Sequence, residues 1–321
     1  MRIVFLGTAA SIPTSTRALS SVAVQRKGEL FLFDCGEGTQ RQMIQAKIGL
    51  NRKTRIFITH LHGDHILGLP GILQTMSLLG RDKPLHIYGP VGTVAFLEAM
   101  IRTVRFSLRF PVYAHEVIEE GLVFQEREYE VQSAWVEHSV PSLAYALIEK
   151  PRPGRFSIKR AVSHGVPKGR LWGRLQQGFD VELPDGKTVR PRDVLGRSRP
   201  GRKIVYVGDT KPSDNIIELA NGGDVLIHEA TFGEELSDRA EEDMHSTPGG
   251  AAMIAKMAEV KLLVLNHISA RYGDTSALLE EARSVFPEAI VAEDFMELEV
   301  PLRERRFLPK EEQSQTGGGS I

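Results

Sequence analysis

The sequence predicts an α/β protein with its sheets inside and its helices outside. Short apolar runs rich in β-branched residues recur along the chain, and each has the length of a buried or half-buried strand. Patterns typical of helices lie between the runs, and strand and helix alternate toward the end of the chain. Sheets covered by layers of helices explain this order. The runs are residues 2–6, 21–25, 30–33, 55–59, 84–88, 203–207, 224–227, 262–265 and 289–292.

Helices are predicted between these strands. The apolar residues from Val94 to Val104 fall on one face of a helix. Thr247 followed by Pro248 is typical of an N-cap and the first helical residue, so a helix is expected to begin there. Ser213 is a candidate cap for an earlier helix. Because polar residues follow several of the strands, we expect one shared site at the strand ends.

Composition and charge narrow the class of protein. The 321 residues are 41% hydrophobic and 25% charged, which is typical of a globular protein with a sizeable core. The net charge of −1 does not demand a nucleic acid or a membrane as partner. The lone cysteine excludes an intramolecular disulfide and suits a reducing compartment. Since there is no apolar run of about 18 residues and no signal peptide, we predict a cytoplasmic protein without membrane contact.

Residues 150–203, here called the basic segment, interrupt the pattern. They contain 15 lysines and arginines but four acidic residues, a net charge of +11, which leaves −12 for the remainder. Large aliphatic side chains are few in the segment, so little internal burial is expected. A run of charge is commonly no more than a solvated face. The contrast with the remainder, together with Phe156, Trp172 and Phe179, favours instead an arm that projects from the body and grips structured RNA.

A cluster of metal-ligand residues follows the fourth predicted strand. The stretch HLHGDH places His60, His62, Asp64 and His65 within six positions. His60 and His62 can point the same way from extended backbone, whereas Asp64 and His65 follow a glycine and can turn toward a second centre. Four ligands this close cannot all reach one tetrahedral ion, so two divalent ions are predicted. A single histidine is commonly a surface or core residue, but this spacing of four ligand types is typical of a dinuclear site.

Two ions need further ligands from elsewhere in the chain. His138, Asp209 and His267 are candidates because each comes just after a strand-like run. A carboxylate commonly bridges two divalent ions, since its two oxygens span the gap between them, and Asp209 fits that role. The histidine-rich set favours zinc, and manganese or iron would fit the same ligands.

Motifs spread over residues 1–307 resemble the ribonuclease Z family of the metallo-β-lactamase superfamily. HLHGDH, a later lone histidine, GDT and NHIS are similar to the superfamily's ligand set, and GTAASIPTSTR, DCGEGTQRQ, HEATF, HST and AEDFM narrow the match. The resemblance implies a four-layer αβ/βα fold over residues 1–308, with the basic segment inserted. It also implies an endoribonuclease that removes the 3′ trailer from precursor tRNA by attack of a metal-bridging hydroxide. Residues 309–321 are polar and glycine-rich and are predicted to be a disordered tail.

The resemblance further implies a ligand set. Asp34 and Glu37 are expected to order their glycine-rich loop and not to bind metal, and His228 is expected to be structural. One ion is expected on His60, His62 and His138 and a second on Asp64, His65 and His267, with Asp209 as the bridge.

Catalytic roles follow from the same resemblance. Asp64 is expected to accept a proton from the attacking water. His245, held by Glu229, is expected to protonate the leaving 3′-oxygen, because a carboxylate orients an imidazole and raises its pKa. The alternative is that His245 only helps to begin the helix at Thr247. Ser246 and Thr247 are expected to contact phosphate at that helix N-terminus.

The resemblance also implies the molecules that the protein binds. In the family that the chain resembles, the basic segment is a flexible arm that clamps the elbow of tRNA and is presented to the partner subunit of a homodimer. We therefore expect precursor tRNA and a second copy of the chain as partners. The residues expected to contact tRNA are Arg152, Arg155, Lys159, Arg160, Lys168, Arg170 and Arg174.

Two other functions compete with this interpretation. Another dinuclear metallohydrolase of the same fold, such as a phosphodiesterase, arylsulfatase or lactonase, would explain the ligands but leaves the basic segment without a role. An RNA-binding protein with structural metal ions would explain the basic segment, but a pair of ions with an open bridging position argues against it.

Overall fold

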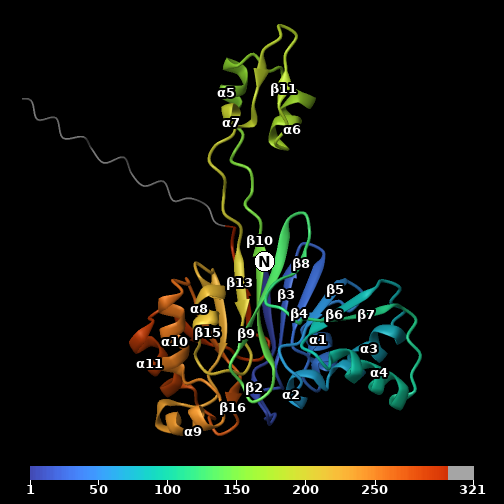
Figure 1. Cartoon of the computed structure of the whole chain (residues 1–321), viewed down its shortest axis with the longest axis vertical. Coiled ribbons are helices and arrows are strands. Elements are labelled where there is room, and N and C mark those ends of the chain that lie inside the picture. Colours follow the sequence, from blue (N-terminus) through green and yellow to red (C-terminus); the bar gives the residue numbers. More distant parts are fainter. Residues whose placement is uncertain (303–321) are drawn as a thin grey trace, which may run out of the picture. The chain divides into compact units, whose positions relative to one another are not determined.

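Two seven-stranded sheets face each other at the centre of the protein (Figure 1). The computed structural model describes residues 1–302. The first sheet has the strand order β18 (Glu297–Glu299), β1 (Arg2–Gly7), β3 (Ser21–Arg26), β4 (Glu29–Phe33), β5 (Lys53–Phe57), β6 (Leu85–Gly89) and β7 (Val112–Glu116). The second has the order β17 (Ala289–Val291), β15 (Leu263–Asn266), β14 (Val225–Glu229), β13 (Lys203–Tyr206), β10 (Ser142–Glu149), β9 (Tyr129–Val136) and β8 (Gly121–Gln125). A short pair, β2 (Ala9–Ala10) and β16 (Ile268–Ser269), lies apart from both sheets.

The strands bury side chains on both faces, which is why their sequences read as apolar runs. Along β1, Ile3 and Phe5 belong to the core between the sheets, whereas Val4 and Leu6 belong to the core under the helices. This alternation follows from the two-residue period of a strand. Aromatic rings from the two sheets meet in the middle, and the Phe33 and Tyr206 ring centroids lie 5.4 Å apart.

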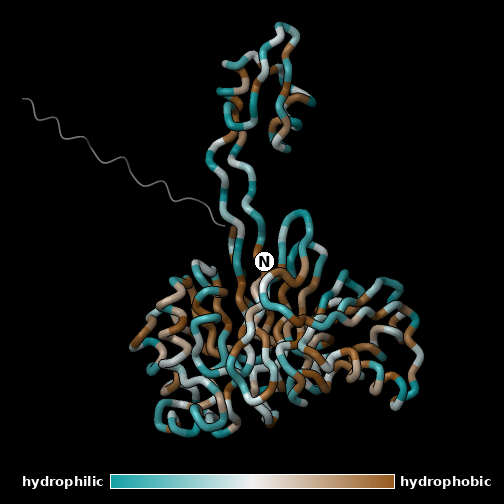
Figure 2. The backbone as a smooth tube through the Cα atoms, in the orientation of Figure 1, coloured by the Kyte–Doolittle hydropathy of each residue, from teal (hydrophilic) through white to brown (hydrophobic). Residues whose placement is uncertain are grey.

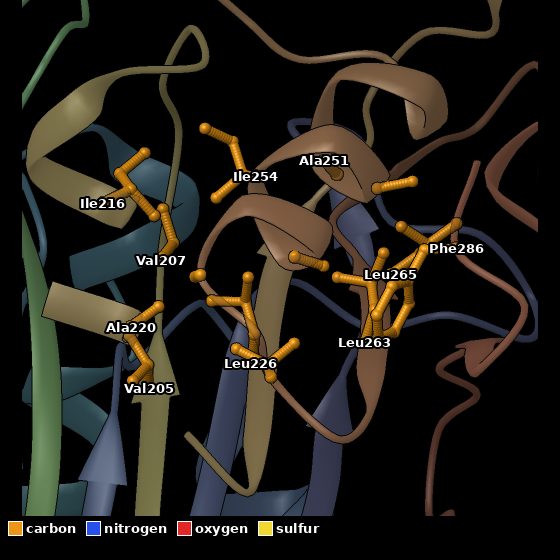
Figure 3. Close-up of a cluster of buried hydrophobic side chains, with 14 of the residues drawn as sticks. Val205, Val207, Ile216, Ala220, Leu226, Ala251, Ile254, Leu263, Leu265 and Phe286 are labelled. Atoms are coloured by element: carbon orange, nitrogen blue, oxygen red, sulfur yellow. The ribbon is translucent and has the colours of Figure 1, made fainter. Parts of the chain in front are cut away.

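Helices cover the outer faces and complete four layers. Figure 2 shows the hydrophobic residues concentrated along the central strands. Over the second sheet, Val205, Leu226 and Leu265 pack with Ile254 of a covering helix and with Phe286, the residue that follows another (Figure 3). The fold class predicted from the sequence is therefore confirmed. The first sheet is covered by α1 (Thr39–Gln45), α3 (Leu69–Leu78) and α4 (Thr93–Val104), the second by α8 (Asp214–Ala220), α10 (Pro248–Met257) and α11 (Ser276–Val285), and short helices α2 (Gly63–Ile66), η1 (Glu234–Leu236) and α9 (Ser237–Glu242) lie in connections.

All nine predicted runs lie on strands, and the predicted helices are present. Thr247 caps α10, with its side chain accepting a hydrogen bond from the Gly250 amide. Ser213 occupies the N-cap of α8 without a side-chain cap hydrogen bond. Apart from the strand-like run just before His138, strands β7 to β10, over residues 112–149, were not predicted, because polar residues interrupt most of them. No described helix is both long and apolar enough to cross a membrane.

The basic segment forms a compact unit of its own over Pro151–Gly201. It contains α5 (Ile158–Ser163), α6 (Arg170–Gln176), the hairpin of β11 (Val181–Glu182) and β12 (Thr188–Val189), and α7 (Pro191–Val194). The expectation that it buries little of itself is wrong, because its few aliphatic side chains converge on one another. Its core consists of Ala161, Val166, Leu175, Val181, Leu183, Val189 and Val194.

Two of the three aromatic residues in the basic segment support that core. The rings of Phe156 and Trp172 lie 5.3 Å apart, and Trp172 Nε1 donates to the Val166 carbonyl at 3.1 Å. Phe179 remains 56% exposed. Of the three, Phe179 alone presents most of its side chain to solvent.

The other unit is formed by Met1–Lys150 and Arg202–Pro301. The predicted tail, residues 309–321, and the last residues of the predicted 1–308 domain lie outside the described residues.

A buried ion-pair network at one end of β10 gives a test of stability. Glu149, 6% exposed, accepts hydrogen bonds from Arg26 Nε at 2.8 Å and from Arg202 Nε and Nη2 at 2.8 and 2.9 Å. Burial raises the pKa of Glu149, but the two guanidinium groups outweigh burial and lower that pKa to about 2. Its contribution to stability is therefore present above the ordinary glutamate pKa and is lost as the pH falls from about 4.5 toward 2.

We predict that Glu149→Gln lowers the free energy of unfolding at pH 7 by about 3 kcal/mol, because Arg202 loses its counter-charge and the buried Arg26 keeps only Glu128 and Glu29 as acidic partners. Urea denaturation of both proteins at pH 7 and pH 3 measures the difference. The difference should shrink at pH 3, and an equal difference at both pH values would contradict the ion-pair explanation.

Candidate metal centre and active site

The candidate site lies where strands of both sheets end. In the first sheet β4, β5 and β6 run parallel, and in the second β13, β14 and β15 run parallel, so their carboxyl ends share an edge. His60 follows β5, Asp209 follows β13 and His267 follows β15. His138 follows the antiparallel strand β9. The topology thus brings together ligand-type residues that are more than 200 positions apart.

One group of ligand atoms comes from His60, His62, His138 and Asp209. His62 Nδ1 lies 3.0 Å from His60 Nε2 and 3.3 Å from His138 Nε2. Asp209 Oδ2 lies 3.7 Å from His60 Nε2 and 3.9 Å from His138 Nε2. Nitrogens separated by these distances can all face one ion at about 2 Å from each.

A second group comes from Asp64, His65, His267 and again Asp209. Asp209 Oδ1 lies 3.2 Å from Nε2 of both His65 and His267. Asp64 Oδ2 lies 3.4 Å from the same two nitrogens. The structure therefore turns Asp64 and His65 toward a different centre from His60 and His62.

Asp209 joins the two groups, with one carboxylate oxygen facing each. Asp209 Oδ1 is buried, yet no group in residues 1–302 donates a hydrogen bond to it. A buried carboxylate oxygen without a donor is costly unless a cation satisfies it. Five imidazole nitrogens and two carboxylates around such an atom are a donor set that fits divalent transition-metal ions.

Both carboxylates of the site are ionised, as binding of a cation requires. Burial raises the pKa values of Asp64 and Asp209, but the adjacent imidazoles of His65 and His267 outweigh burial and hold both pKa values below the usual range. Burial lowers the pKa of His60. The His60 imidazole is therefore available in its neutral, ligating form.

A layer of hydrogen bonds orients the ligand side chains. His65 Nδ1 lies 2.8 Å from Asp34 Oδ2, which also accepts from Tyr206 Oη at 2.9 Å. His138 Nδ1 donates to the Met244 carbonyl at 3.0 Å. His267 Nδ1 lies 2.8 Å from Thr231 Oγ1. Such partners fix the ring orientation and the tautomer of a metal-binding histidine.

We predict that Asp34→Asn weakens metal retention by about 10- to 100-fold, because His65 loses the carboxylate that orients its ring. Metal release to a chelator, followed with a colorimetric indicator, measures the effect. Glu37→Gln is the matched control, since Glu37 is an exposed acid in the same loop. An equal change in both variants would show that the charge of the loop, and not the contact with His65, controls retention.

A carboxylate–imidazole pair lies beside the second group. His245 Nδ1 lies 2.7 Å from Glu229 Oε1. Glu229 is fully buried and also accepts from the Thr210 and Thr231 amides at 2.8 and 3.1 Å. Burial lowers the pKa of His245, but the Glu229 carboxylate outweighs it and raises that pKa to about 9. Near neutral pH the pair holds a proton on His245.

The residues after His245 are engaged inside the protein. Ser246 is 1% exposed and its hydroxyl donates to the Thr210 carbonyl at 2.7 Å. The Thr247 side chain accepts from the Gly250 amide as the cap of α10. The geometry thus opposes the expected phosphate contact for Ser246, because its hydroxyl is buried and already donates.

An open cleft of about 540 Å³ reaches both groups and His245. Its wall includes Phe232, Arg239 and Arg271, which were not among the predicted site residues. The Arg239 and Arg271 guanidinium carbons lie 5.6 and 5.1 Å from the centroid of the Phe232 ring. Phe232 is the last residue of the HEATF motif and Arg271 lies two residues after NHIS, so closeness to a motif was an available signal, whereas Arg239 carried none.

The predicted tRNA contacts of the basic segment lie within its own unit. Arg152 is half-buried and its backbone pairs with Arg199. The others are exposed, on α5, on α6 or in the connections: Arg155, Lys159, Arg160, Lys168, Arg170 and Arg174.

Comparisons with known proteins agree with this geometry. Residues 1–101 match the family model described as Anti-Pycsar protein Apyc1, and residues 177–268 match the Beta-lactamase superfamily domain. A ribonuclease Z from Methanosarcina acetivorans is 50% identical over 94% of this chain and 99% of its own length. The chain belongs to the ribonuclease Z family. A second ribonuclease Z, from Haloferax volcanii, is 48% identical over 94% of this chain and 95% of its own.

Solved structures place the chain in the same family and fold. The short form of human tRNase Z is similar with a TM-score of 0.70 and 33% identity, over 94% of this chain and all of that one. The metallo-β-lactamase fold protein YhfI from Bacillus subtilis matches with a TM-score of 0.65 at 18% identity, over 92% of this chain and 98% of that one, and shows the fold alone. The family resemblance inferred from the sequence motifs is confirmed.

Proposed function

We propose that this member of the ribonuclease Z family is a metal-dependent endoribonuclease that removes the 3′ trailer from precursor tRNA. The products are tRNA with a 3′-hydroxyl and a trailer with a 5′-phosphate. The observation that carries the proposal is Asp209, whose two oxygens face two separate groups of ligand atoms at the floor of an open cleft. Family membership supplies the substrate class.

The ligand sets are the two groups described above. His60, His62 and His138 would hold one ion, Asp64, His65 and His267 the other, and Asp209 both. We favour two zinc ions, with manganese or iron as alternatives, because imidazole donors predominate. When bound, the ions would activate water and neutralise the charge that develops on the phosphoryl group.

We assign the two proton transfers of the reaction to side chains of the protein. Asp64 Oδ2 faces both His65 and His267 and lines the cleft, so it can accept the proton of the attacking water. His245 carries a proton near neutral pH, lines the same cleft and is held by Glu229. It can give that proton to the leaving 3′-oxygen of the tRNA.

The basic segment, residues 150–203, is proposed to bind the tRNA at a distance from the cut. Its net charge of +11 and the exposure of Lys159, Arg160, Lys168, Arg170 and Arg174 support a phosphate-binding role. We further propose that the protein acts in the cytoplasm, and as a homodimer in which the segment serves the partner's site.

The direct test is cleavage of a 5′-labelled precursor tRNA that carries a 3′ trailer. Metal-loaded protein should cut once, near the discriminator base, and chelated protein should not cut. Ligation to the new 3′ end and digestion of the trailer by a 5′-phosphate-dependent exonuclease identify the two termini. Absence of cleavage by fully metallated protein would refute the proposal.

Removing the basic segment distinguishes the proposed ribonuclease from a small-ester hydrolase. Replacing residues 151–201 by a short glycine–serine linker should lower kcat/KM for precursor tRNA by about 100-fold or more, because many phosphate contacts are lost. Hydrolysis of bis(p-nitrophenyl) phosphate should stay within about threefold. Unchanged cleavage of precursor tRNA would show that the basic segment does not bind this substrate. Hydrolysis of the small diester without any cleavage of precursor tRNA by the wild-type protein would favour the small-ester hydrolase.

A further inference from the structure

The segment from Thr8 to Ala18, here called the first loop, forms part of the wall of the cleft. Ala10, Ser11 and Ile12 line it. The Ser11 amide donates to Asp64 Oδ2 at 2.9 Å, the same oxygen that faces the second ligand group. Ser11 has φ 49°, a left-handed conformation that a serine adopts only when its surroundings impose it. Something outside the loop must therefore hold this amide in place.

Asp294 holds both ends of the first loop. Its Oδ1 accepts from the Thr8 hydroxyl at 2.8 Å, and its Oδ2 accepts from the Ala18 amide at 2.8 Å. A third donor, Gln42 Nε2, reaches Oδ2 at 2.9 Å and the Leu6 carbonyl at 2.7 Å. Hydrogen bonds to a carboxylate are stronger than those between neutral groups. One side chain thereby closes the loop at its base, where the Ala9 amide also donates to the Ala18 carbonyl at 2.9 Å.

The first loop also forms a backbone hydrogen bond beside a second ligand-type residue, His267. The Ile268 amide, next to His267, donates to the Thr8 carbonyl at 2.9 Å. The short strands β2 and β16 continue this contact, with Ile268 opposite Ala9. Thr8 thus contacts Asp294 through its side chain and the chain beside His267 through its backbone.

We infer that Asp294 is a positioning residue for the hydrolytic site. By closing the first loop it aims the Ser11 amide at Asp64 and so fixes the direction of the carboxylate that binds metal and accepts the proton. The inference rests on the role proposed for Asp64. Asp294 neither lines the cleft nor belongs to the ligand groups, and acts only through the loop.

The test is Asp294→Asn. The substituted amide keeps the size of the side chain but has one oxygen in place of two, so in either orientation at least one of the three donors, two N–H groups and the Thr8 hydroxyl, loses its acceptor. We expect kcat for bis(p-nitrophenyl) phosphate and for precursor tRNA to fall by about 10- to 100-fold, with KM little changed. Metal retention against a chelator should fall, and backbone hydrogen exchange of residues 8–18 should accelerate.

Two further variants sharpen the result. Glu293→Gln removes the same charge from the neighbouring exposed residue and should behave as wild type. Thr8→Val is the second test if Asp294→Asn does not fold. It removes one donor to Asp294 at nearly constant shape, while Arg17, which also donates to the Thr8 hydroxyl, keeps the Ala292 carbonyl, and we expect a smaller loss of about fivefold.

Several outcomes would overturn the inference. Folded, metal-loaded Asp294→Asn with wild-type turnover of the small diester shows that Asp294 is merely structural. A change confined to KM for precursor tRNA shows that the loop binds RNA and does not position Asp64. The small diester also separates this inference from the proposed function, because its hydrolysis requires the metal site and not the tRNA.

Discussion

Replacing Asp64 with alanine should lower kcat/KM for precursor tRNA by about 10³-fold or more. The change removes a ligand of the second group and the group proposed to accept the proton of water, and proton transfer alone contributes about 10²- to 10⁴-fold. Metal content should fall toward one ion per chain, because His65 and His267 lose the oxygen that lies 3.4 Å from both. Cleavage of the labelled precursor and elemental analysis of the same samples measure the two effects together.

Asp238→Ala is the matched control, since Asp238 is an exposed aspartate of α9. It should retain both activity and metal. Full metal content with unchanged turnover in Asp64→Ala would show that Asp64 is neither ligand nor base.

Replacing His245 with alanine should lower kcat by about 10²- to 10⁴-fold while the metal content remains that of wild type. The reason is that His245 is proposed to protonate the leaving oxygen, and it is absent from both groups that contain Asp209. The effect should be much smaller for a substrate whose leaving group is a weak base, such as p-nitrophenolate. An equal loss on both substrates would point to a structural role instead.

The same pair gives a pH dependence with a defined sign. In the proposed mechanism His245 acts in its protonated form, and Glu229 raises its pKa to about 9. Activity should therefore fall as the pH rises through that value. In Glu229→Gln the imidazole loses the carboxylate, its pKa falls, and the alkaline limb of the kcat profile should move to lower pH. An unmoved limb would assign it to another group.

Much of the fold and most of the ligand-type residues could be predicted from the sequence, for physical reasons. Strands buried on both faces, such as β1 and β4, must be almost wholly apolar, so they appear as short hydrophobic runs. The residue after such a strand is the first that can be polar, which is why His60, Asp209 and His267 were conspicuous. HLHGDH carries its chemistry within six adjacent positions.

The remaining features depend on contacts between distant segments. Nothing local shows that Asp34 meets His65, that the Met244 carbonyl meets His138, or that Asp294 closes the loop at Thr8. The burial of Ser246 could not be predicted either, because a serine before a capped helix is as readily buried as exposed. The long strands β9 and β10 were missed because the alternating polar residues of β9 and the small residues of β10 weaken the hydrophobic signal.

The small core inside the basic segment has an evolutionary consequence. A segment that packs on itself, with Leu175, Val181 and Val189 among its buried residues, has its own stability requirements. Mutations on its exposed surface can accumulate without disturbing the ligand groups, and mutations near the ligands need not unfold the segment. Substrate recognition, the role proposed for the segment, can therefore diverge at a separate rate from bond cleavage, and exchanging the segment between relatives is a proposed route to altered RNA preference with unaltered chemistry.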